Sequence, residues 1–255
     1  MGWASKIDNS NLAVSRGLVT GQSYIEKFGR NTTIASGAQE VIWDQADAAY
    51  TYMASASTLY ISSSNNTDDE TFEVQGLDAN WDLQTVNVIV SGFTFVALTG
   101  TWMRVFRARN ISATDPLGDV YISDDNTDTD GGADGIPDTA TNIKAKVLVG
   151  NNQTNMAIYS IPRGYTGYLQ HWYVTLLRAT GVTAVAADCD ILRREFGSTF
   201  KSTQPVGIQN TGSGIYHYDY TYPLALSEKM DIEVRVQPTG AADASAGFTI
   251  LLIKN

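Results

Sequence analysis

Apolar and polar residues alternate along much of this chain. In MDIEVRV (residues 230–236), Ile232, Val234 and Val236 point to one side of an extended strand, while Glu233 and Arg235 point to the other. Such a period of two predicts antiparallel sheets with one solvated face. Strands are likewise predicted in TFEVQGLD, TVNVIVSGFTFVAL, TWMRVFRARNI, KAKVLVG, MAIYSI, GYLQHWYVTLLR, DCDILRREF and FTILLIKN.

Turn signals separate these stretches at short intervals. They include GLDAN, IPRGYTG, QNTGSG and QPTGAADASAG, which are rich in the residues that tight turns prefer. No segment shows a helical period over three turns, and no internal repeat indicates a solenoid or propeller. The sequence therefore predicts an all-β fold, an antiparallel β-sandwich of the jelly-roll-like kind.

The first part of the chain differs from the rest. Residues 1–45 are polar, punctuated by glycine and without a strong period, so we expect an extended N-terminal arm that lies over the domain or onto a neighbour. A loosely ordered terminus is the alternative. Residues 46–255 are expected to form the β-sandwich domain, with two packed sub-sandwiches as a variant of that prediction.

Composition and charge exclude several classes of protein. A chain of 255 residues buries enough surface to fold without a disulfide or metal, and its single cysteine, Cys189, cannot form an intrachain bridge. The formal net charge of −10 argues against a nucleic-acid partner. The start shows no signal peptide and no apolar run is long enough to span a bilayer, so we expect cytoplasmic synthesis and no membrane partner.

The acidic stretch SDDNTDTDGGADGIPDT, residues 123–139, is the sharpest local signal. Its oxygen-bearing residues Asn126, Asp128, Asp130 and Asp134 have the spacing with which calcium-binding loops of the DxDxDG type begin. The twelfth position from Asn126 is Pro137, where an EF-hand needs glutamate, so the loop is not an EF-hand. A structural calcium ion is one prediction, and a solvated acidic loop is the alternative. No cofactor is required for folding.

A row of tyrosines occupies alternate positions in GIYHYDYTYP, residues 214–223. On a strand they share one side: Tyr216, Tyr218, Tyr220 and Tyr222. A phenol has an apolar face and a polar edge, which suits sugar stacking and protein interfaces alike. Because a straight row lacks the convergence of a ring-sized site, we predict a subunit interface, with a partly buried core edge as the alternative.

Catalytic patterns have little support. The serine-hydrolase elbow, the Walker A loop and the Rossmann glycine pattern are all absent. Asp78 and Asp82 flank Trp81 as a candidate carboxylate pair, but we expect them to cap a turn. His217 and Asp219 share a strand face without an identifiable third metal ligand. We therefore expect a protein that is not an enzyme.

Several stretches, in order from about residue 22 to the end, resemble a family of virion proteins from tailed, notably marine, bacteriophages. They are YIEKFGRN, VIWD, GLDANWDLQTVNVIVSGFTFVAL, MAIYSIPRGYTGYL and DIEVRV with ASAGFTILLIKN. The resemblance implies a β-sandwich structural component of the particle. It brings no set of functional residues that could be carried over to positions in this chain.

These observations predict a capsid-decorating or cement protein that binds the exterior of the phage head. Its expected partners are further copies of itself, with a trimer favoured, and the major capsid protein. Its expected location is the virion, after synthesis in the host cytoplasm. The alternative is a head or tail appendage that binds host surface glycan through exposed tyrosine and tryptophan. A hydrolase that degrades the host envelope is a third possibility.

Overall fold

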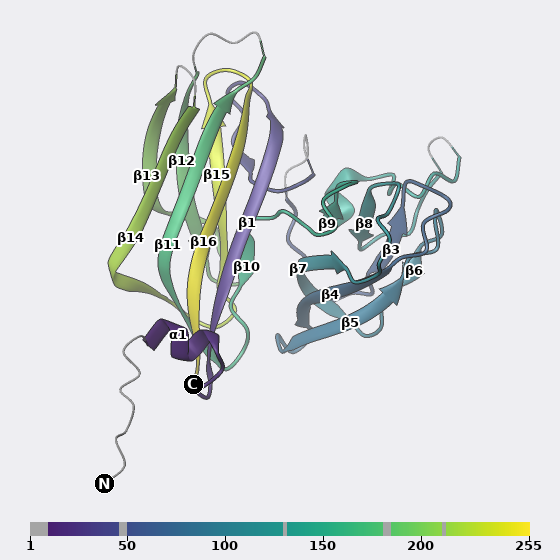
Figure 1. Ribbon diagram of the computed structural model, residues 1–255, viewed down its shortest axis with the longest axis horizontal. Helices are drawn as coiled ribbons and strands as arrows, with labels where there is room; N and C mark the ends of the chain where they lie inside the picture. The colour runs from purple at the N-terminus through teal and green to yellow at the C-terminus, as the bar shows by residue number, and fades with distance from the viewer. Residues whose placement is uncertain (1–9, 46–49, 130–131, 181–184, 211–212) are drawn as a thin grey trace.

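The protein consists almost entirely of antiparallel strands arranged in two bodies that lie side by side (Figure 1). The computed structural model describes residues 10–45, 50–129, 132–180, 185–210 and 213–255. In these ranges the helical segments are α1 (Ser10–Ser15) and a single 3-10 turn, Ala140–Asn142. The predicted all-β class is confirmed.

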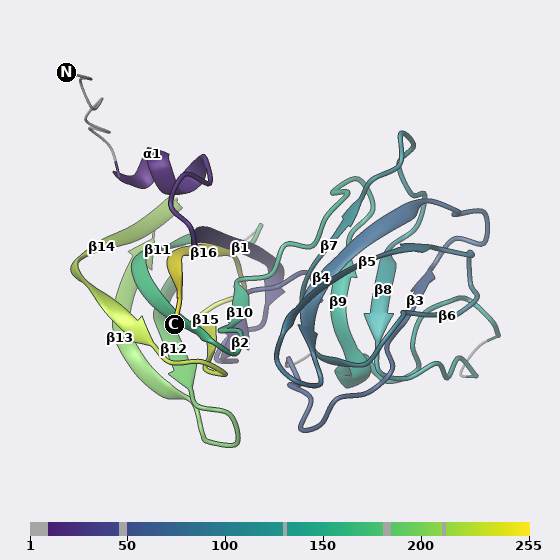
Figure 2. The same cartoon turned by 90° about the horizontal axis from the view of Figure 1, so that it is seen from below.

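The larger body is a sandwich of two sheets that face each other (Figure 2). The first sheet has the order β1 (Gln22–Ile34), β16 (Ala242–Lys254), β11 (Tyr165–Arg178) and β14 (Ser213–Leu226). The second has the order β10 (Ile158–Ser160), β15 (Asp231–Pro238), β12 (Val185–Arg194) and β13 (Lys201–Asn210), and β2 (Glu40–Val41) also pairs with β15. The inward positions of both sheets form one apolar core, which includes Leu169, Trp172, Val234, Phe248 and Ile250.

The smaller body has its own core and two smaller sheets. One sheet has the order β6 (Val96–Ala97), β3 (Tyr60–Ser63), β8 (Val120–Ser123) and β9 (Ile143–Val147). The other has the order β5 (Leu83–Ile89), β4 (Thr71–Asp78) and β7 (Trp102–Asn110). Their buried side chains pack together, among them Leu59, Ile61, Phe72, Val74 and Trp102.

The smaller body is an insertion into one edge strand of the sandwich. β2 and β10 pair with successive parts of β15, so together they occupy one strand position. Between them, the Ile42 N–H donates to the Val234 carbonyl at 3.0 Å, and the Ala157 N–H donates to the Ile42 carbonyl at 2.9 Å. Residues 43–156 are therefore inserted between two halves of one strand position. The two ends of the insertion lie next to each other, where Trp43 and Met156 form a β-bridge.

The arm expected over residues 1–45 contains a strand of the first sheet. β1 pairs with β16 along most of its length and forms the edge beside the inserted body. The buried positions in the middle of β1 are Lys27, Gly29 and Asn31. Because none of these is an apolar side chain, the alternation of this strand is invisible in the hydrophobic pattern.

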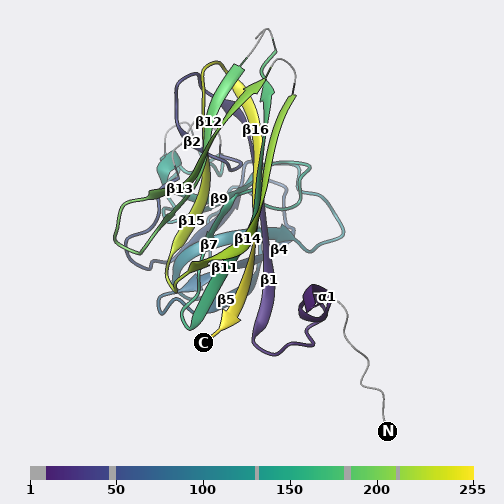
Figure 3. The same ribbon diagram turned by 90° about the vertical axis from the view of Figure 1, so that its left-hand side faces the viewer.

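The short helix α1 lies at the end of the sandwich where the C-terminus also lies (Figure 3). The Tyr24 hydroxyl of β1 donates to the Asn11 side-chain oxygen at 2.8 Å, which ties the helix to the first sheet. Within the described part of the chain, no helix has the length and apolar character needed to cross a membrane.

We expect Gly29→Ala to lower the free energy of unfolding by about 1 to 3 kcal/mol, because overpacking against backbone atoms forces them to move. A Cβ atom at position 29 would lie 2.4 Å from the Ile42 carbonyl oxygen and 2.5 Å from the Ala157 nitrogen. Urea denaturation measures the change. Gly207→Ala is the control, since its Cβ would meet no atom within 4 Å. Equal stability of the two variants would contradict the close approach.

Candidate functional site

The tyrosine row lies on β14, at the edge of the first sheet. Tyr216 is half-buried: its ring lies 5.3 Å from that of Trp172, and its hydroxyl accepts a hydrogen bond from Gln204 Nε2 at 3.0 Å. Tyr220 is also half-buried and meets Tyr218 edge-on at 4.9 Å. Tyr218 is 39% exposed and Tyr222 is 88% exposed. Half-buried and exposed tyrosines thus alternate along the row. The interface at Tyr216, Tyr218, Tyr220 and Tyr222 stays a prediction.

In the acidic loop, backbone N–H groups donate hydrogen bonds to two of the loop's own carboxylates. Asp128 Oδ2 accepts the N–H groups of Asp134 at 3.0 Å and Gly135 at 2.8 Å, and Asp134 Oδ1 accepts that of Ile136 at 2.9 Å. Asn126 is exposed, and Asp130 lies outside the described residues. Within the residues that the structure describes, no three His, Cys, Asp or Glu side chains are grouped to hold a metal. The calcium loop stays a prediction.

The remaining polar candidates have structural partners. Asp78 Oδ1 accepts the N–H groups of Asn80 and Asp82, so it caps the turn that contains Trp81, as expected. Asp219 pairs with His171 of the neighbouring strand, with 2.8 Å between Oδ1 and Nδ1.

Cys189 lies in the sandwich core. Burial raises the pKa of its thiol to about 12. The group therefore stays protonated at neutral pH and is a poor nucleophile.

A buried charge cluster joins the two bodies at Asp231 of β15. Arg104 of β7 binds this carboxylate with both ends of its guanidinium, Nε to Oδ1 at 2.9 Å and Nη2 to Oδ2 at 3.0 Å. Arg194 Nε donates to Oδ2 at 3.0 Å, and the Ser160 hydroxyl donates to Oδ1. Arg104 and Asp231 are at most 2% exposed. The single carboxylate thus receives donors from the sandwich and from the inserted body.

Arg104 also makes contacts that fix its own position. Its Nη1 donates to the carbonyl groups of Met53 at 2.8 Å and Met103 at 2.7 Å. Its guanidinium lies 4.9 Å from the ring centre of Trp81 and 5.1 Å from that of Tyr52. Cation–π contacts of this kind favour a desolvated guanidinium.

A second carboxylate, Glu233, extends the cluster along β15. The Tyr52 hydroxyl donates to it at 2.6 Å, and Arg235 Nε donates to its other oxygen. Burial raises the pKa of Glu233, and the charge of Arg235 opposes that rise. We call this set, Arg104, Arg194, Arg235, Asp231, Glu233 and Tyr52, the inter-body clamp. No local sequence pattern indicates this set, because its members are far apart in the chain.

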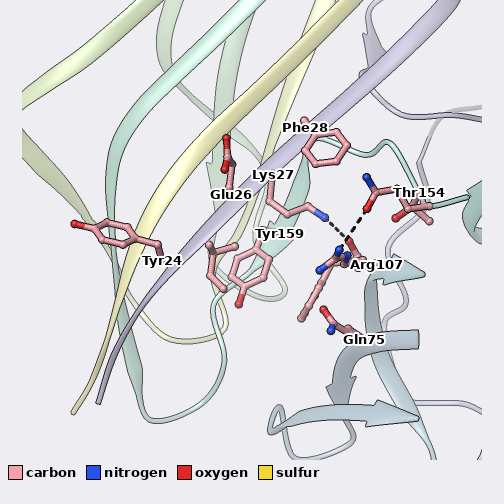
Figure 4. Close-up of a pocket in the computed structure, with 11 residues that line it drawn as sticks. Tyr24, Glu26, Lys27, Phe28, Gln75, Arg107, Thr154 and Tyr159 are labelled. Atoms are coloured by element: carbon pink, nitrogen blue, oxygen red, sulfur yellow. Dashed lines mark hydrogen bonds between the residues drawn. The ribbon is translucent and has the colours of Figure 1, made fainter. Parts of the chain in front are cut away.

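A cleft of about 340 Å³ opens between β1 and the inserted body (Figure 4). Both bodies contribute to its lining, which includes Tyr24, Lys27, Phe106, Arg107, Gln153 and Tyr159. The Tyr159 hydroxyl is buried and finds no hydrogen-bond partner among the residues that the structure describes. Burial raises the pKa of this phenol, so it stays protonated.

Lys27 is the unusual group of the cleft. Its side chain comes from the middle of β1, is 7% exposed and donates from Nζ to the Phe106 carbonyl oxygen. Burial lowers the pKa of Lys27 to about 7, and repulsion from Arg107 adds to the effect. Among the described residues, no carboxylate lies within ion-pair distance of its Nζ. The ammonium is therefore buried without a countercharge.

A second cleft lies further along β1 and contains Asp44 and Arg30. Burial raises the pKa of Asp44 to about 7, although the Asn155 N–H donates to its Oδ2 at 2.8 Å. Arg30 pairs with Asp243 of β16. The junction between the bodies thus holds a lysine and an aspartic acid that both titrate near neutral pH.

No family model matches this chain, and no curated protein matches it. The solved structures that are similar at low TM-score include the structure of the Gt strain of infectious bursal disease virus and the crystal structure of an infectious bursal disease virus VP2 subviral particle. The first has a TM-score of 0.26 and 10% identity, over 92% of this chain and 73% of the other. The second has a TM-score of 0.23 and 9% identity, over 92% and 72%. These likenesses do not assign a function.

Replacing Asp231 with asparagine should lower the free energy of unfolding by about 3 to 5 kcal/mol, because it leaves Arg104 buried without its countercharge. Thermal and urea denaturation measure the loss. The control is Asp82→Asn, which breaks the exposed pair with Arg163, where both side chains are about half exposed. That change should cost no more than about 1 kcal/mol. Similar losses in the two variants would contradict the role of the clamp.

Lys27→Met should stabilise the protein, and the gain should shrink as pH rises from 7 to 10. The folded-state pKa of about 7 lies below the ordinary 10.5, so the unfolded chain binds more protons across this window. Wild-type stability therefore gains from rising pH, whereas the methionine variant lacks this contribution. Urea denaturation at pH 7, 8, 9 and 10 measures the difference, with the exposed Lys201→Met as control. A pH-independent difference would contradict the lowered pKa.

Proposed function

We propose that this protein is a non-enzymatic virion structural protein that decorates and stabilises the exterior of a phage head. The observation that carries the proposal is the architecture: a sandwich whose edge strand is interrupted by a second body, with the two fixed by a buried clamp. Such an arrangement supplies one surface for the capsid lattice and another that projects from it. The resemblance to phage virion proteins supports the same role.

The strand order supports a jelly roll for the sandwich body. With β2 and β10 counted as one position, each sheet has four strand positions, and the first strand, β1, lies beside the last, β16. The strands β10, β11 and β12 alternate between the two sheets, as do β13, β14, β15 and β16, while β12 and β13 are neighbours in the second sheet. Two sheets filled in this way are characteristic of jelly rolls, a fold that viral capsid and lectin domains use.

The edge strand β14 supports self-association. It ends the first sheet, so one row of its backbone groups is open to pairing with another chain. Tyr218 and Tyr222 are exposed on this strand, and tyrosine is a residue that interfaces favour. We propose that copies of the protein, in a trimer, contact one another through β14 and bind the major capsid protein across capsomer boundaries.

Particles that lack the protein provide the direct test of the proposed function. Adding back the purified protein should raise the temperature at which the heads release their genome, because it buries area across neighbouring capsomers. Electron microscopy of the restored particles should show it on the head. Heads of unchanged stability whose adsorption to the host is lost would contradict decoration and favour the appendage that binds glycan.

The double change Tyr218→Ser and Tyr222→Ser should weaken self-association at least about tenfold, since exposed aromatic anchors dominate many interfaces. Light scattering over a concentration series measures the mass. The folded state should tolerate the change because both rings are exposed. The control is Leu117→Ser, which alters an apolar residue of the inserted body whose exposed fraction, 67%, lies between those of Tyr218 and Tyr222. Unaltered association in the double variant would contradict the interface on β14.

A further inference from the structure

We propose that the cleft between β1 and β7 binds a sugar ring that carries a carboxylate, of the uronic acid class. This inference concerns a site remote from β14 and goes beyond a structural role on the head. It is based on three features of the cleft: an uncompensated cationic end, a wall of amide and hydroxyl groups, and aromatic rings that face the same space.

The cationic end consists of Lys27 and Arg107. A lysine ammonium has three donor hydrogens, and the only hydrogen bond of Lys27 Nζ in the described structure goes to the Phe106 carbonyl. Arg107 donates to Gln153 Oε1 at 3.3 Å, a neutral partner. Two neighbouring cations in a protein with a net charge of −10 form a local site of opposite sign. A carboxylate placed between them would satisfy donors that are otherwise unpaired.

The acids nearest to the cleft do not neutralise this end. Glu26 lines the cleft, but its side chain points away from the Lys27 ammonium (Figure 4). Glu73 is bound by Arg109, with Nε to Oε1 at 2.8 Å and Nη2 to Oε2 at 3.2 Å. The charge of Glu73 acts on Arg107, but among the described residues Lys27 has no carboxylate within ion-pair distance. A carboxylate that enters the cleft would supply this countercharge.

The rest of the lining fits a sugar ring better than a simple acid. Gln75 Nε2 donates to Glu73 Oε1 and Gln153 Oε1 accepts from Arg107, so these amides would offer a hydroxyl group the Gln75 oxygen as acceptor and the Gln153 nitrogen as donor. The rings of Phe106 and Tyr159 meet each other at 4.7 Å and are only 6% and 1% exposed at the cleft. Phe28, which also lines the cleft and is 38% exposed, supplies the accessible ring (Figure 4). Aromatic rings stack against the C–H face of a sugar. A volume of about 340 Å³ lies within the range of small-molecule sites.

The test is calorimetric titration of the full protein with glucuronate, glucose and acetate at pH 6.5. We expect glucuronate to bind at least tenfold more tightly than either of the others, since only it engages both the cations and the ring-binding wall. Lys27→Met and Arg107→Gln should each weaken glucuronate binding at least tenfold. Lys27→Met removes an uncompensated buried charge, so the variant should remain folded, which its melting curve verifies.

Arg163→Gln is the matched control, because it removes an exposed arginine of the surface pair with Asp82 and should leave binding unchanged. Absence of glucuronate binding, or equal binding to wild type and Lys27→Met, would overturn the proposal. Acetate or glucose binding as tightly as glucuronate would overturn the assignment to an acidic sugar. Head decoration is measured independently, so either proposal can fail without the other.

Discussion

The arrangement of the two bodies depends on one buried carboxylate, that of Asp231. Removing a charge from water costs several kcal/mol, and Asp231 recovers this cost only where Arg104, Arg194 and Ser160 all reach it. Arg104 comes from the inserted body, so the sandwich alone cannot complete the set. A displaced inserted body would separate Arg104 from Asp231 and leave this carboxylate with Arg194 and Ser160 alone. The clamp therefore favours one arrangement of the two bodies over others. Any other arrangement would cost the free energy of a charge that has lost its partner, which apolar contacts alone would not impose.

The insertion point explains why the clefts occur where they do. The chain leaves the sandwich after Ile42 and returns at Ala157, and β1 crosses this junction so closely that only glycine fits at position 29. Side chains of β1 on either side of the crossing then face the inserted body instead of the sandwich core. Lys27 lies in the first cleft and Arg30 lines the second. The edge strand β1 thus lines both clefts between the sandwich and the inserted body.

The strands with apolar alternation, such as β15 and β16, were predictable because apolar side chains at every second position leave a period of two in the sequence. The solvated face expected for β15 is wrong, since its polar side carries Asp231 and Glu233, which are buried in the clamp. β1 was hidden within the predicted arm because its buried positions carry lysine, glycine and asparagine. The tyrosine row was predictable as a row, but the exposure of its members was not. Tyr222 is 88% exposed because the register of β14 against β11 shifts between Asp219 and Leu224. The clamp needs residues 52, 104, 194 and 231 in one place, and only tertiary structure brings them together.

A cation buried without a countercharge at the mouth of a cleft links binding to stability. Lys27 keeps its pKa near 7 because burial disfavours its charged form, so near neutral pH the protein either carries a costly charge or loses a proton. An anion in the cleft would favour the charged form and raise that pKa, so its binding would take up protons and stabilise the fold. Natural proteins often accept lower stability where a site needs it. If the lysine served packing alone, methionine would fill the same space without the cost.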